Sequence, residues 1–153
     1  MTNIDPSLDL YVKAIYGKKA SDLVVIDVQG LTSVADIFII CSGSSNRQVS
    51  AIAEHIQKEL KGYEIKPLSI EGIKEGQWVL LDYGHIIIHV FYDTVRSFYN
   101  LEGLWTDAPR IKTPAMLEYE ISQPEISQPD KDQIKEEPEE EEESEQGESD
   151  ARY

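Results

Sequence analysis

Two apolar segments joined by only two residues constrain the fold of this chain more than any other feature. Residues 77–82 and 85–91 are rich in β-branched and aromatic side chains, and Tyr83-Gly84 is all that separates them. So short a connection predicts a tight antiparallel hairpin with Gly84 at a positive φ. The register would then pair Asp82 with His85, Leu81 with Ile86, Val79 with Ile88 and Trp78 with His89.

Alternation along this hairpin predicts two sheet faces of different character. One face is aliphatic, as expected where helices cover a sheet, and contains Val79, Leu81, Ile86, Ile88 and Val90. The other mixes aromatic and polar groups: Trp78, Leu80, Asp82, His85, Ile87, His89 and Phe91. Because tryptophan is enriched at binding hot spots, Trp78 makes the mixed face a candidate partner surface. The alternative, a core tryptophan beneath a loop, stays open.

Outside the hairpin, the sequence patterns of residues 1–109 predict three more strands and three helices. Residues 23–28, 36–41 and 65–70 are β-branched and apolar, as strands are. Apolar side chains at helical spacing predict the helices, the last with a stripe of Phe98, Leu101 and Trp105. The helix ends are marked by Asp5-Pro6, Gly17, a capping box of Ser45 and Gln48, Lys61-Gly62, Asp93 and Ala108-Pro109.

These elements predict one α/β domain over residues 1–109. The strand, helix and strand between residues 36 and 70 would form a right-handed parallel crossover. With the antiparallel hairpin, this gives a mixed sheet of about five strands with helices packed on it.

The charges of the chain are unevenly distributed. Residues 1–117 carry 14 acidic and 11 basic side chains, whereas residues 118–153 carry 15 acidic and 3 basic ones. Four prolines and the run Glu139 to Glu143 interrupt any apolar periodicity after residue 109. Such a segment cannot bury enough apolar surface to offset the entropy of ordering it. We therefore predict that residues 110–153 form a disordered acidic tail.

The sequence favours a cytoplasmic protein. Its apolar runs are far shorter than the ~20 residues needed to span a bilayer, and its first residues lack the features of a targeting segment. The single cysteine, Cys41, allows no intramolecular disulfide, which fits a reducing compartment.

Catalytic and metal sites are only weakly indicated. The SGSS motif at residues 42–45 could hold phosphate at a helix N-terminus, but it lacks the lysine of a P-loop. A Gly-Ser pair also opens the active site of nucleotidyltransferases, which further need two alternating carboxylates. Residues 52–57 are helical and offer only Glu54. His85 and His89 would lie about 13 Å apart along a strand and cannot share an ion. We predict no catalytic residue, metal or cofactor.

Three segments of the chain resemble the ribosomal silencing factor, or Iojap-like, family. They are ADIFIICSGSSNRQVSAIAEHI (35–56), EGIKEGQWVLLDYGHIIIHVF (71–91) and RSFYNLEGLWTDA (96–108). Three motifs in the family's order and spacing make the resemblance specific, and it covers about residues 5–109. It implies a nucleotidyltransferase-like topology without the catalytic carboxylates, often as a homodimer.

The resemblance also implies a function. Family members bind the large ribosomal subunit through ribosomal protein L-fourteen, where the small subunit would dock, and thereby repress translation, notably under nutrient limitation. No sequence-specific contact to nucleic acid is implied. The positions that match the family's contact motif are Trp78, Leu80, Asp82, Tyr83, Glu71, Lys74, Glu75, Arg96 and Tyr99. His85 departs from the pattern, which usually has an acidic residue after Tyr-Gly.

Three hypotheses follow. The leading one is a non-catalytic repressor of translation that acts by steric exclusion. The second is a factor for large-subunit assembly, to which organellar relatives are linked. The third is a nucleotidyltransferase using the loop at Gly43-Ser44, which would have to bind a nucleoside triphosphate with magnesium.

Overall fold

A mixed five-stranded sheet organises the residues that the computed structural model describes, which are 5–122. Only the β2–β5 pair is parallel, and the other neighbouring strands are antiparallel. The predicted mixed α/β sheet is therefore confirmed. The strands are β1 (Ser21–Asp27), β2 (Ile37–Gly43), β3 (Ser69–Glu71), β4 (Trp78–Asp82) and β5 (Ile86–Tyr92), in the order β1-β2-β5-β4-β3. β2 and β3 point the same way, as the predicted crossover requires, but β5 and β4 lie between them.

The hairpin register differs by two residues from the prediction. Leu81 pairs with Ile88 and Val79 with Val90, because the Tyr83 N–H donates to the carbonyl of Ile86 and makes Gly84-His85 the two central residues of the turn. Gly84 has φ +92°, as predicted, whereas His85 does not have a positive φ. A glycine at the first central position is the requirement of a type II′ turn, which explains the shift. Since the shift is an even number of residues, every side chain keeps its predicted face.

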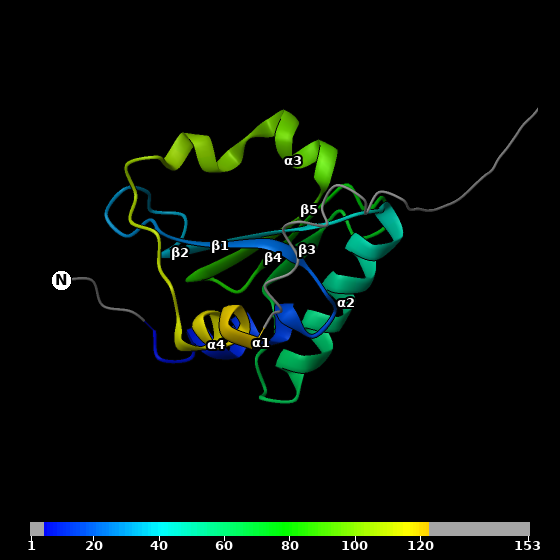
Figure 1. Cartoon of the computed structure of the whole chain (residues 1–153), viewed down its shortest axis with the longest axis horizontal. Helices are drawn as coiled ribbons and strands as arrows, with labels where there is room; N and C mark the ends of the chain where they lie inside the picture. The colour runs from blue at the N-terminus through cyan, green and yellow to red at the C-terminus, as the bar shows by residue number, and fades with distance from the viewer. Residues whose placement is uncertain (1–4, 123–153) are drawn as a thin grey trace, which may run out of the picture. The chain divides into compact units, whose positions relative to one another are not determined.

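The two faces of the sheet are covered by different helices (Figure 1). On one side lie α1 (Leu8–Tyr16), α2 (Asn46–Lys61) and the start of α4 (Pro114–Ser122); on the other lie α3 (Asp93–Tyr99) and the 3₁₀ helix η1 (Leu101–Trp105). All five predicted aliphatic side chains of the hairpin belong to the core beneath α1 and α2. The second core is smaller and more aromatic, with Phe38, Phe91 and, partly buried, Trp78 and Trp105.

The helix ends differ in detail from the sequence signals. Helix α1 begins at Leu8, because the Asp5 carboxylate accepts hydrogen bonds from the N–H and Oγ of Ser7 in the turn before it. At the start of α2, Ser45 Oγ accepts from the Gln48 N–H at 3.1 Å, as the predicted capping box requires. Gln48 Oε1 accepts from the N–H of Ser44 at 2.6 Å, one residue earlier than such a box would have it.

The predicted helix over residues 93–108 is broken in two. Asn100 adopts a left-handed conformation with φ 45°, which ends α3 and begins η1. Because of this break, Phe98 no longer faces the same way as Leu101 and Trp105. Leu101 and Trp105 pack on the sheet, whereas Phe98 is 79% exposed. Asp93 is the first residue of α3 and makes no capping hydrogen bond, so its predicted capping role is wrong.

Residues 110–122 are ordered, which corrects the predicted boundary at residue 109. The Ile111 N–H donates to the Val25 carbonyl at 2.9 Å, and Ala115 and Met116 are buried against the core. The compact unit that contains the sheet ends at Leu117. The predicted disorder of residues 123–153 lies outside the described residues. Among the described helices, none is long and apolar enough to cross a membrane.

Candidate functional site

An exposed aromatic surface lies where β4 meets α3. Trp78 and Leu80 of β4 are half-buried, and Tyr99 of α3 lies over Trp78 with ring centroids 5.0 Å apart. Phe98 meets Tyr99 edge to face at 5.1 Å. We call Trp78, Leu80, Phe98 and Tyr99 the Trp78 surface. Three of these four residues were predicted as partner contacts from the sequence.

Trp78 is held by two residues of the neighbouring strand β5. Its ring stacks on Phe91 with centroids 4.8 Å apart, and its Nε1–H donates to Nδ1 of His89 at 3.1 Å. His89 is only 5% exposed, and burial lowers its pKa to about 4. The imidazole is therefore neutral near pH 7, with Nδ1 as acceptor and the proton on Nε2. The indole is thus fixed in place before any partner arrives.

Arg96 extends from α3 toward β1 and β2, away from the Trp78 surface. Its guanidinium pairs with Glu102 at 2.8 Å and donates to Ser42 Oγ at 2.7 Å and to the Asp22 carbonyl at 2.8 Å. The pKa of Glu102 is lowered although burial alone would raise it, because the hydrogen bonds and charge of Arg96 stabilise the carboxylate. Arg96 therefore joins α3 and η1 to the sheet, and its guanidinium already has its partners within the fold.

We expect Arg96→Gln to lower the free energy of unfolding by about 2 kcal/mol, because it leaves the partly buried Glu102 carboxylate without its cation and removes the hydrogen bonds to Ser42 and Asp22. Urea denaturation at pH 7 measures this loss. Arg47→Gln is the matched control, since Arg47 is exposed in the first turn of α2. Equal stabilities of the two variants would contradict the assigned role of Arg96.

The remaining predicted contacts lie in different environments. Glu71, Lys74 and Glu75 are exposed on β3 and the loop that follows it, beside the start of β4. Asp82 is partly engaged, since its Oδ1 accepts from the Gly84 N–H at 2.8 Å. Tyr83 is 7% exposed and packs edge to face on Tyr11 in the core beneath α1.

Phe98 is the member of the Trp78 surface that sequence reasoning placed in the apolar stripe of the last helix, with Leu101 and Trp105. The signal against that assignment was present, because Phe98 and Tyr99 are consecutive. Consecutive helix residues point about 100° apart, so Phe98 and Tyr99 could not both lie in one apolar stripe.

The loop at Gly43-Ser44 shows no arrangement for catalysis. Its N–H groups are engaged by the chain itself, that of Ser44 by Gln48 Oε1 and that of Gln48 by Ser45 Oγ. Burial raises the pKa of the neighbouring Cys41 thiol to about 12, so it is no nucleophile at pH 7. His85 contacts the Asp5 carboxylate instead of a metal site. Within residues 5–122, no cluster of three or more potential metal ligands occurs.

Comparisons with known proteins place this fold in a family. A family model described as "Ribosomal silencing factor during starvation" matches residues 2–151, beyond the end of the resemblance seen in the sequence motifs. Ribosomal silencing factor RsfS of Halalkalibacterium halodurans is 42% identical over 112 residues, which are 72% of this chain and 94% of that protein. A crystal structure from Chromobacterium violaceum has a TM-score of 0.64 at 36% identity and covers 68% of this chain and 87% of that one.

A more distant relative is the mouse protein "Mitochondrial assembly of ribosomal large subunit protein 1". It is 31% identical over 102 residues, which are 65% of this chain and 45% of the mouse protein. The family resemblance read from the three motifs is therefore confirmed. With its family-model match, its bacterial relative and its mixed sheet, the chain belongs to the ribosomal silencing factor family.

Proposed function

We propose that this protein represses translation by binding the free large ribosomal subunit in the cytoplasm, through ribosomal protein L-fourteen, and preventing the small subunit from joining. Membership of the ribosomal silencing factor family supports the class of function. Nutrient limitation is the condition that the family description suggests for it.

The observation that carries the proposed contact is the Trp78 surface. Its four members are partly or fully exposed apolar side chains on adjacent elements, with Tyr99 53% exposed. Trp78 is already fixed by Phe91 and His89, so little side-chain entropy is lost when a partner covers it. Aromatic anchors of this kind, held in place and partly desolvated, are the usual hot spots of protein interfaces.

Charged and polar groups border this surface and would form the rim of the interface. We propose Glu71, Lys74, Glu75 and Asp82 for this role, which fits their exposed or partly exposed positions. Arg96 and Tyr83 would support the interface from within the fold, because their side chains are already engaged or buried.

Steric exclusion needs no chemistry. A factor that occupies the docking surface lowers the concentration of joinable large subunits by mass action. In the loop at Gly43-Ser44, the Ser44 N–H already donates to Gln48, and the nearby Cys41 thiol is buried. Both observations are consistent with a regulator that catalyses no reaction. This favours the repressor over the nucleotidyltransferase hypothesis.

The proposal is tested by binding to purified large subunits and by the rate at which the two subunits join. We expect Trp78→Ala and Tyr99→Ala each to weaken subunit binding by at least about 30-fold and to restore subunit joining. Tyr99→Ala removes an exposed ring and should leave the fold unchanged, so it remains informative even if Trp78→Ala is destabilised. Leu31→Ala, at an exposed position outside the Trp78 surface, is the control.

Wild-type protein that neither binds large subunits nor slows joining would overturn the proposal. So would turnover of a nucleoside triphosphate with magnesium. A homodimer, which the family resemblance implies, is a separate proposal that light scattering checks.

Assembly of the large subunit is a second candidate, favoured by the name of the mouse relative. Depletion of the protein would then accumulate precursor particles in growing cells. Under pure silencing, depletion would leave assembly intact and cause a defect only in starvation.

A further inference from the structure

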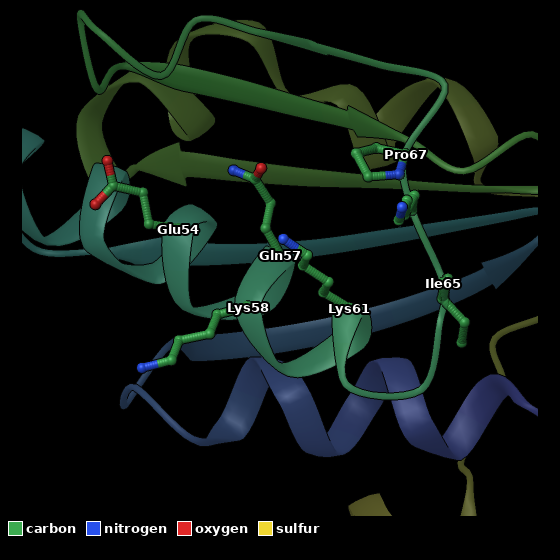
Figure 2. Close-up of a pocket in the computed structure, with 7 residues that line it drawn as sticks. Glu54, Gln57, Lys58, Lys61, Ile65 and Pro67 are labelled. Carbon is green, nitrogen blue, oxygen red and sulfur yellow. The ribbon is translucent and has the colours of Figure 1, made fainter.

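A groove rimmed by lysines lies on the opposite side of the sheet from the Trp78 surface. It has a volume of about 630 Å³ and runs between the second half of α2 and the segment that leads to β3 (Figure 2). Its lining contains three lysines and one acidic residue: Glu54, Gln57, Lys58, Lys61, Ile65, Lys66 and Pro67. We call Lys58, Lys61 and Lys66 with Ile65 and Pro67 the lysine groove.

The backbone that shapes this groove is fixed by hydrogen bonds. After α2, the Ile65 N–H donates to the Leu60 carbonyl at 3.0 Å and the Glu64 N–H to the Lys61 carbonyl at 2.8 Å. Helix α2 ends at Lys61, as Lys61-Gly62 predicted, and Glu64 with φ 62° completes a Schellman motif in the left-handed conformation. Ile65 packs on the core. The lysine groove is therefore a preformed feature of the fold.

The charge of the groove contrasts with that of the whole chain, which is −15. None of Lys58, Lys61 and Lys66 forms an ion pair with another residue in the range 5–122. Lys58 and Lys61 lie in the last turn of α2, where cations stabilise the helix dipole. That effect does not account for Lys66, which lies beyond the helix. In Figure 2, Lys61 extends toward Gln57, whereas Lys58 extends away from both Gln57 and Pro67.

We propose that the lysine groove binds the phosphate backbone of RNA on the large ribosomal subunit. The inference rests on the proposed function, and adds an RNA contact to the protein contact at the Trp78 surface. A strongly acidic protein is repelled by RNA except where its charge is locally reversed, so such a contact must form at a lysine-rich site. Lysine ammonium groups suit phosphates of any sequence. The apolar floor of Ile65 and Pro67 can lie against a ribose.

Both contacts can form in a single docking event. Pro67 lies two residues before β3, and Trp78 begins β4, the strand paired with β3. The Leu68 N–H donates to the Asp82 carbonyl at 2.6 Å, which ties the groove segment to the hairpin. The lysine groove therefore lies near the Asp82 end of β4, and the Trp78 surface lies toward the other end of the same strand, on the opposite side of the sheet.

The test measures binding of the full chain to purified large subunits over a range of salt concentrations. The variant is Lys61→Gln with Lys66→Gln, and the matched control is Lys13→Gln with Lys18→Gln. The control also removes two charges, one of them in the last turn of a helix. We expect the groove variant to bind about 10- to 50-fold more weakly near 0.1 M salt and to lower the slope of log K against log salt by about 1.5. The control should bind like the wild type.

A second measurement separates this inference from the proposed function. A fluorescent 20-nucleotide RNA duplex at low salt should bind wild type and Trp78→Ala equally, and the groove variant more weakly. Failure of the wild type to bind subunits, with RNA binding intact, would refute only the proposed function. The RNA contact would be overturned if the groove variant had the same slope of log K against log salt as the wild type. It would also be overturned if polyglutamate with the same total charge displaced the RNA. Equal melting temperatures of both double variants verify that they fold.

Discussion

Acidification from pH 7 to pH 4 should lower the free energy of unfolding by about 3 kcal/mol through one side chain, His89. The unfolded chain binds a proton on this imidazole near the ordinary pKa of 6.5, whereas burial in the folded protein lowers that pKa to about 4. Between these values the unfolded state binds more protons, so stability falls as pH falls. The loss begins near pH 6.5 and is complete near pH 4.

His89→Asn isolates this contribution. Asparagine is neutral at every pH in the window, and its side-chain oxygen can replace Nδ1 as the acceptor for the Trp78 indole. Urea denaturation at intervals from pH 7 to pH 4 should show a wild-type loss that exceeds the variant's by about 3 kcal/mol. Asp5 and Glu102, whose pKa values are lowered, also reduce stability toward acid, but they do so in both proteins. Parallel pH profiles would contradict a neutral buried His89.

This titration also concerns the proposed interface. When Nδ1 of His89 is protonated, it can no longer accept from the Trp78 indole, and a buried charge faces an aromatic core. Subunit binding through the Trp78 surface should therefore weaken near pH 4, where His89 binds its proton in the folded protein. The same buried histidine that stabilises the binding surface at neutral pH makes it acid-sensitive.

The sheet could be predicted largely because its signals are local. Alternation along β4 and β5 assigns each side chain to a face, and this survives a register shift of two residues. The shift was missed because a Tyr83-Gly84 hairpin turn would need a positive φ at Tyr83, whereas a Gly84-His85 turn needs one only at Gly84. The end of α2 at Lys61 was marked locally by Lys61-Gly62. The left-handed conformation of Glu64, next to Ile65 that packs on the core, had no such local signal.

The candidate site was only partly accessible to sequence reasoning. Trp78 stands out as a tryptophan on a mixed strand face, but the exposure of Phe98 depends on the break at Asn100. The lysine groove has no linear signature, because Lys61 and Lys66 lie on opposite sides of a turn whose geometry follows from the fold. Surfaces built across such breaks and turns become visible only when the chain is folded.

Gly72→Ala should destabilise the protein by about 3 to 4 kcal/mol and disturb the Trp78 surface. Gly72 has φ +85°, where an L side chain is strained, and a Cβ there would lie 2.2 Å from the Trp78 carbonyl oxygen. The contact is with the backbone of β4, so no side-chain rotation relieves it. Either β4 or the loop carrying Lys74 and Glu75 must move.

Gly30→Ala is the matched control, because Gly30 has φ +81° but nothing within 4 Å of an added Cβ. It should cost only about 1 kcal/mol, the strain of the left-handed conformation alone. The difference between the two variants in urea denaturation then measures the close approach of Gly72 to β4. Since a shift of the Trp78 backbone misplaces its ring, folded Gly72→Ala should also bind large subunits more weakly than Gly30→Ala. Equal losses of stability in the two variants would show that β4 and the loop move apart freely, contrary to a preformed Trp78 surface.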